Sequence, residues 1–206
     1  MIYVSSSCVK NNTIKESVEE LAQEGYKNIE ISGGTKYYDG YVNDLLDLKD
    51  NYNLNYLLHN YFPPPKIPFN FNLASQNKLI RKKSLDLAKK AIDLCRQIDS
   101  PLYTFHGGFT TDPKKLGVKF TREKIFPKSK SILTFIDSVF EIVDFAKSNG
   151  IKLAMEPNVV QKFNLIRNKN ELLVFAELDE IEILFKFFKT FCRLVISSKL
   201  LILFIE

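Results

Sequence analysis

Residues 57–75 read "LLHNYFPPPKIPFNFNLAS", in which an apolar run ends at His59 and Asn60 and a proline-rich segment follows. The pattern is typical of a buried strand that leads into a stiff loop, because proline fixes φ and removes a backbone donor. A helix with apolar residues at 3.6-residue spacing comes next, and we expect Ser75 or Asn72 to be its N-cap. The stretch therefore predicts one βα unit of a parallel sheet.

The same alternation of short apolar runs and amphipathic segments repeats along the chain, which is typical of a parallel β/α barrel. Helices are predicted between the strands; the first has Thr13 as its N-cap and stops at Gly25, and another stops at Gly150. The predicted strands are "IYVSSS" from Ile2, "NIEISGG" from Asn28, "NYLLHN" from Asn55, "LYTFHGG" from Leu102 and "IKLAMEPN" from Ile151.

The C-terminal part of the chain departs from this order. Residues 158–206 contain neither Gly nor Pro, although the first 157 residues hold all eight of each. Loops use these residues for caps and turns, so we expect few ordinary connections here. Residues 171–190 are predicted to form one helix. We therefore predict two regions, a partial barrel over residues 1–170 and a helix with an apolar tail over residues 171–206.

Three interpretations of the apolar tail remain open. We favour a truncated or frame-shifted end over a sixth strand or packed helix. A membrane anchor is the least favoured, because its apolar runs fall short of the roughly 20 residues that a spanning helix needs. Four cations interrupt these runs: Lys186, Lys189, Arg193 and Lys199.

The composition is that of a globular domain, with 45% hydrophobic and 26% charged residues in 206. The three cysteines are far apart and fit neither a zinc pair nor a disulfide framework. The N-terminus has no secretion signal, so we expect a cytoplasmic protein. The net charge of +5 only weakly favours an anionic partner.

Three side chains that can bind metals fall at equivalent places in consecutive units. His59, His106 and Glu156 end the third, fourth and fifth predicted strands. Neighbouring parallel strands lie about 4.8 Å apart, so inward-facing residues at their carboxyl ends can converge on one ion. Imidazole nitrogen and carboxylate oxygen suit Zn²⁺, Mn²⁺ or a similar divalent metal. Each residue alone could instead be a structural histidine or a salt-bridge partner, but together they predict a metal site.

Four neighbouring residues are candidates for substrate binding. Gly107 would let the backbone approach a ligand closely, or would simply make a tight turn. Asn60 and Asn158 could bind sugar hydroxyls, or could close turns after their strands. Glu30 lies on the second predicted strand and is either a substrate contact or a charge at the rim of the core.

The strings "LHNYFPPP" with "NLAS", then "FHGG", then "AMEPN" resemble the xylose isomerase-like barrel superfamily, which contains sugar phosphate isomerases and epimerases and apurinic endonucleases. The resemblance covers about residues 1–165 and implies an α/β fold, a (β/α)₈ TIM barrel with divalent metal. By position, it implies metal binding for His59 and His106, and metal binding or acid/base catalysis for Glu156. Family ligands on strands six to eight are missing here, so we expect a partial barrel of about five to six βα units.

These features together favour a metal-dependent isomerase or epimerase acting on a sugar or sugar phosphate, with Glu156 as the catalytic residue. Because the second carboxylate of the family is missing, we expect an incomplete protein with little or no turnover alone. One alternative is a phosphodiesterase for abasic DNA, but nucleic acid is a less favoured partner because that chemistry needs more metal ligands. Another is a non-catalytic remnant that self-associates through an open sheet edge.

Overall fold

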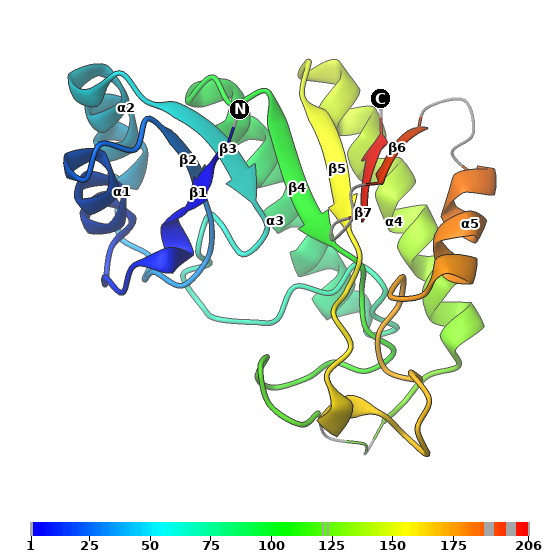
Figure 1. Ribbon diagram of the computed structural model, residues 1–206. Helices are drawn as coiled ribbons and strands as arrows, with labels where there is room; N and C mark the ends of the chain where they lie inside the picture. Colours follow the sequence, from blue (N-terminus) through cyan, green and yellow to red (C-terminus); the bar gives the residue numbers. More distant parts are fainter. Residues whose placement is uncertain (1, 121, 123, 188–191, 197–200, 206) are drawn as a thin grey trace.

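Five parallel strands form the centre of the fold (Figure 1). The computed structural model describes residues 2–120, 122, 124–187, 192–196 and 201–205. The five strands lie side by side in chain order, so the strands predicted from the sequence and the α/β, partial TIM-barrel class are confirmed. Their bounds are β1 Val4–Ser5, β2 Asn28–Ile31, β3 Asn55–His59, β4 Leu102–His106 and β5 Lys152–Glu156.

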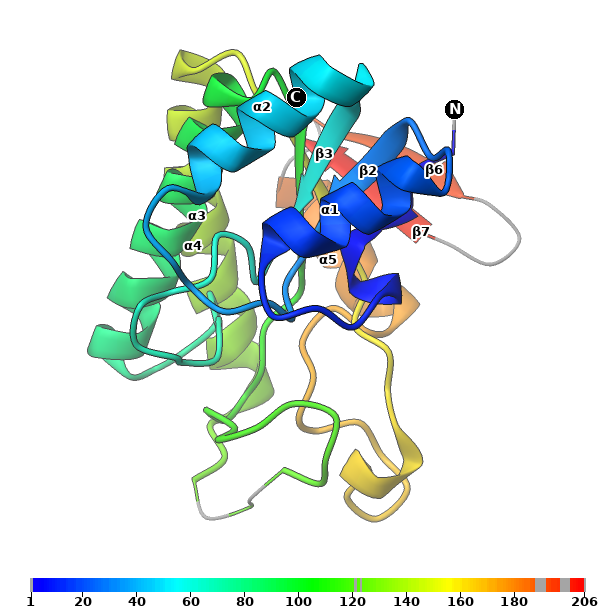
Figure 2. The ribbon, with the colours of Figure 1, turned by 90° about the vertical axis from the view of Figure 1, so that its left-hand side faces the viewer.

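Helices connect successive strands and lie on the outer side of the curved sheet (Figures 1 and 2). The first helix begins as predicted, because Thr13 and Glu16 form a reciprocal capping box at its start. A 3₁₀ turn, η1 (Ser6–Cys8), follows β1. The four helices are α1 (Ile14–Gln23), α2 (Tyr41–Tyr52), α3 (Lys78–Gln97) and α4 (Lys128–Ser148).

The N-cap of α3 differs from the prediction. Asn77 caps this helix, since its side chain accepts hydrogen bonds from the backbone N–H groups of Leu79 and Ile80. Asn72 is instead buried in the loop before α3, where its amide nitrogen donates to the carbonyl oxygens of Phe109 and Thr111. The predicted N-cap was therefore wrong, because the side chain of Asn72 instead joins the loop before α3 to the loop after β4.

The main core lies between the sheet and the helices. The apolar face predicted for the first helix is buried as expected, at Ile14, Val18, Leu21 and Ala22. Burying a large apolar side chain of this kind contributes roughly 1.5–3 kcal/mol. The helices thus hold the strands in register and fix the carboxyl ends of β3, β4 and β5 relative to one another.

Two long loops extend together beyond the carboxyl ends of the strands (Figures 1 and 2). Their described residues are 107–120, 122 and 124–127 in the first loop and 157–177 in the second. A short 3₁₀ helix, η2 (Lys162–Asn164), lies in the second loop. The loops enclose a second apolar cluster that is separate from the main core. It contains Phe109, Phe120, Leu172 and Leu173.

The predicted helix over residues 171–190 is wrong in its first part. Helix α5 spans only Leu178–Phe187, and residues 172–175 form a buried segment that is not helical. Residues 188–191 lie outside the described residues. Arg167, Asn168 and Phe175 adopt positive φ and supply turns that the sequence prediction assigned to glycine or proline. The absence of Gly and Pro therefore did not exclude connections here.

The last strands run against the parallel order. Strands β6 (Cys192–Ile196) and β7 (Leu201–Ile205) pair antiparallel, and β7 also pairs antiparallel with β5. Within the part of the chain that the structure describes, no helix is both long and apolar enough to cross a bilayer. The boundary between residues 170 and 171 stays a prediction.

Candidate metal centre

The strand register brings the predicted ligands to one face of the sheet. His106 is the direct partner of Glu156, and His59 is the partner of Thr104, two residues before His106. Residues in register, and residues two apart on one strand, point to the same face. His59, His106 and Glu156 therefore share the inner face at the carboxyl edge, and one ligand atom from each lies within 4.8 Å of the others.

His59 ends β3 and is largely buried, with 12% of its side chain exposed. Its Nδ1 atom lies 2.6 Å from Oγ1 of Thr104 and 3.9 Å from Oε1 of Glu156. Burial, together with the neighbouring His106, lowers the pKa of His59 to about 3. The imidazole is therefore neutral at neutral pH, which makes the contact with Glu156 a polar contact and not an ion pair.

His106 lies directly beside His59. The two rings are perpendicular, with centroids 5.0 Å apart. Nδ1 of His106 lies 3.3 Å from the backbone carbonyl oxygen of Glu156. Burial lowers the pKa of His106 as well. Both rings thus present neutral nitrogens, which is the form that binds a metal ion.

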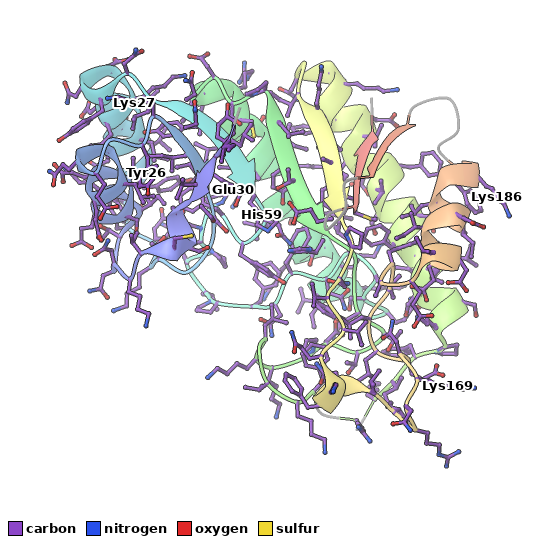
Figure 3. All side chains as sticks on the ribbon, viewed as in Figure 1. Tyr26, Lys27, Glu30, His59, Lys169 and Lys186 are labelled. Carbon is purple, nitrogen blue, oxygen red and sulfur yellow. The ribbon has the colours of Figure 1, made fainter. Side chains whose placement is uncertain are left out.

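Glu156 ends β5 with 22% of its side chain exposed, and burial raises the pKa of its carboxyl group. Glu30 lies on β2, next to β3, and Figure 3 shows it and His59 on these neighbouring strands. Burial raises the pKa of Glu30, and repulsion from Glu156 adds to the effect. Glu30 is therefore within electrostatic reach of the three clustered side chains.

Gly107 lies against the second long loop. A Cβ atom at Gly107 would overlap the carbonyl oxygen of Val174 and crowd the side chain of Phe175. Asn158 lies beside it, and its amide nitrogen donates to the carbonyl oxygens of Gly108 and Val174, each at 3.0 Å. These contacts give Gly107 and Asn158 a role in packing the two long loops, while their contact with substrate stays a prediction.

Asn60 directly follows His59, in the turn after β3. Its backbone N–H donates to the carbonyl oxygen of Thr104. The residue is 1% exposed, and neither polar atom of its side chain has a hydrogen-bond partner among the described residues. Substrate binding by Asn60 also stays a prediction.

Sequence reasoning missed Thr104, which is buried and holds the ring of His59. The signal was present in the sequence, because Thr104 lies two residues before His106 in "LYTFHGG" and must share its face. A metal-binding histidine usually has its second ring nitrogen fixed by such a polar partner. Thr104 is therefore part of the candidate site.

The parallel β/α sheet carries polar side chains at the carboxyl ends of its strands. This arrangement is typical of TIM-barrel proteins, whose active sites lie at that face. The family model described as xylose isomerase-like TIM barrel matches residues 18–183. The chain belongs to this family.

Relatives with described activities are sugar epimerases. Fructoselysine 3-epimerase of Shigella flexneri is 23% identical over 171 residues, which cover 78% of this chain and 55% of the relative. An uncharacterised protein of Methanocaldococcus jannaschii is 28% identical over 156 residues, which cover 74% of this chain and 47% of that protein. The chain thus spans about half the length of the curated relatives that it matches.

Solved structures support the same fold. A D-tagatose 3-epimerase-like protein matches with a TM-score of 0.57 and 24% identity, covering 76% of this chain and 53% of that one. A D-allulose 3-epimerase from Methylomonas sp. matches with a TM-score of 0.54 and 15% identity, covering 89% of this chain and 57% of that one. At these identities the match concerns the fold alone.

Proposed function

We propose that the chain is a metal-dependent sugar isomerase or epimerase-like domain in which His59, His106 and Glu156 hold one divalent ion. The observation that carries the proposal is the convergence of two imidazoles and one carboxylate within 4.8 Å, from three consecutive strands. This donor set fits Zn²⁺ or Mn²⁺, and three protein ligands leave a coordination position for substrate. The ion would polarise a sugar carbonyl and the neighbouring hydroxyl.

The protein groups around the ion have separate roles in this proposal. Thr104 holds the ring of His59 through Nδ1, and the carbonyl oxygen of Glu156 holds the ring of His106 through Nδ1, which leaves Nε2 of His106 as a ligand atom. Glu156 binds the ion or accepts a proton from the sugar carbon. Epimerisation also needs a second group that delivers a proton to the opposite face of that carbon, because a proton returned to the same face regenerates the substrate. Glu30 positions the substrate hydroxyls from β2.

We further propose that this polypeptide alone turns sugars over slowly or not at all. The three donors come from β3, β4 and β5 only, and the strand beyond β5 is antiparallel. One side of a bound sugar would then be open to water, and poor positioning and solvent access both slow proton transfer. Self-association through the open sheet edge, and whether the sugar is free or phosphorylated, stay predictions.

The proposal is tested by calorimetric titration of the chain with a ketohexose such as D-allulose, with and without Mn²⁺. We expect binding that requires the metal and is lost in Glu156→Gln. Chromatography of the same mixtures should reveal little or no epimer. Robust metal-dependent epimerisation would contradict the low-turnover part, and metal-independent sugar binding would contradict the role of the ion.

A further inference from the structure

A groove of about 520 Å³ lies away from the metal centre, and none of its lining residues belongs to that centre. Pro63, Pro64 and Pro65 of the loop after β3 form one side. Tyr37, in the loop before α2, and Tyr41, the first residue of α2, form another. The third side is the outer surface of α3. Figure 2 shows the loop after β3 and the loop that leads into α2 next to α3. The proline-rich segment therefore lines a site of its own.

The groove offers flat apolar surfaces. The rings of Tyr37 and Tyr41 pack edge to face, with centroids 6.1 Å apart, and Phe69 and Leu87 add to the apolar lining. Ile67 lies in the lining with 76% of its surface exposed. Aromatic and proline faces are surfaces on which a planar ring stacks.

The charges in the groove are predominantly positive. Lys66, Lys83 and Lys90 line it, with Asp86 as the acidic residue of the lining. Asp86 is already paired with Lys82 at 2.8 Å. One of these cations contacts an aromatic ring, since Nζ of Lys83 lies over the ring of Phe69 at 5.9 Å from its centroid.

A second cation of the groove also lies over an aromatic ring. Nζ of Lys66 lies 4.8 Å from the ring centroid of Tyr37 and 3.4 Å from Oδ1 of Asp39. Lys90, on α3, makes no ion pair with any described residue. The groove thus combines ring faces with an uncompensated positive charge.

We propose that this groove binds a small aromatic anion of the nucleoside monophosphate class. The base stacks on the rings of Tyr37 and Phe69 against the proline wall, and the phosphate contacts the lysines of α3. The volume is within the range of about 300–1,000 Å³ that small-molecule sites occupy. Stacking supplies affinity without base specificity, and the lysines supply a salt-dependent contribution.

The test is calorimetric titration of the metal-free full chain with AMP at low salt. Tyr37→Leu keeps apolar bulk but removes the ring, and we expect it to weaken binding about fivefold or more. Tyr37→Phe keeps the ring and is the matched control, which should bind as the wild type does. Lys83→Ala should weaken AMP binding and reduce its salt dependence, whereas Lys78→Ala, an exposed lysine on the same helix outside the lining, should not.

Two further ligands separate the sources of affinity. Inorganic phosphate should bind more weakly than AMP, because it lacks the ring. Equal affinity for phosphate, no AMP binding by the wild type, or equal effects of Lys83→Ala and Lys78→Ala would overturn the proposal. A single-stranded oligonucleotide that binds while AMP does not would overturn it in favour of a nucleic-acid surface.

Discussion

Nδ1 of His106 lies 3.3 Å from the backbone carbonyl oxygen of Glu156, its direct register partner on the neighbouring strand. Since a carbonyl oxygen only accepts, the hydrogen bond places the proton on Nδ1 and leaves Nε2 unprotonated. One metal ligand of the proposed centre thus orients another through its backbone. The strand register by itself therefore prepares part of the site.

The hydroxyl of Thr104 should hold the ring of His59 in place for metal binding. We expect Thr104→Val to weaken Mn²⁺ binding about tenfold, since removing a polar partner of a metal-binding histidine typically costs 10- to 100-fold in affinity. Thr104→Ser keeps the hydroxyl and should bind Mn²⁺ nearly as the wild type does. Equal affinities for the two variants in calorimetric titrations would remove Thr104 from the site.

Glycine at position 107 is required by packing. We expect Gly107→Ala to lower the free energy of unfolding by about 3 kcal/mol, because the new Cβ atom would overlap the backbone of Val174 and overpacking costs are of this order. Gly117→Ala meets no atom within 4 Å, although its φ of +75° is strained, so it should cost only about 1 kcal/mol. Urea unfolding measures both, and equal losses would contradict the tight packing at Gly107.

A buried ion pair between Lys128 and Glu180 joins the start of α4 to α5. We expect Lys128→Met to destabilise the fold by about 3 kcal/mol, because it leaves the buried Glu180 carboxylate unpaired. Lys130→Met, two residues along the same helix on its exposed surface, should change stability little. The double variant Lys128→Met/Glu180→Leu should recover most of the loss, and a double variant no more stable than the single one would argue against this pairing.

The low pKa of His59 makes stability depend on pH in a defined direction. The folded-state pKa is about 3 and the usual value is 6.5, so the unfolded chain binds the proton first and stability falls as pH drops below about 6.5. Between pH 6.5 and 5.5 the metal-free wild type should lose about 1 kcal/mol more than His59→Gln. The raised pKa values of Glu30 and Glu156 stabilise the fold as the pH falls, which is the opposite effect. The wild type and His59→Gln both contain these two residues, so their contribution is common to both proteins. Urea unfolding at the two pH values should reveal this difference, and identical losses would contradict a buried neutral His59.

The strands and the proposed ligands could be read from the sequence because local patterns determine them. Short apolar runs ending in His59, His106 and Glu156 predict both the strands and the common edge, and the structure bears out the strands. The structure of the segment that follows β5 could not be predicted in this way. Phe175 adopts a φ of +57°, and a phenylalanine in the sequence does not indicate a positive φ. The buried apolar residues near it have a spacing that resembles that of a helix.

The groove beside the proline-rich loop was equally invisible in the sequence. Its rings and lysines come from three separate segments, and only the tertiary structure brings Tyr37, Phe69 and Lys83 together. Proline signals stiffness in a single segment, but it does not indicate which surface that segment faces. The same limit applies to Asn72, whose polar partners lie in the loop after β4.

The most direct test of the proposed metal centre is a calorimetric titration of the metal-free chain with Mn²⁺, comparing the wild type, Glu156→Gln and the exposed-surface control Glu171→Gln. We expect the wild type and Glu171→Gln to bind one ion per chain, and we expect Glu156→Gln to bind it more than about 100-fold more weakly, since a lost ligand should cost more than a lost supporting contact. Circular dichroism should confirm that all three proteins are folded. Unchanged affinity in Glu156→Gln, or no stoichiometric binding by the wild type, would contradict a metal centre built from His59, His106 and Glu156.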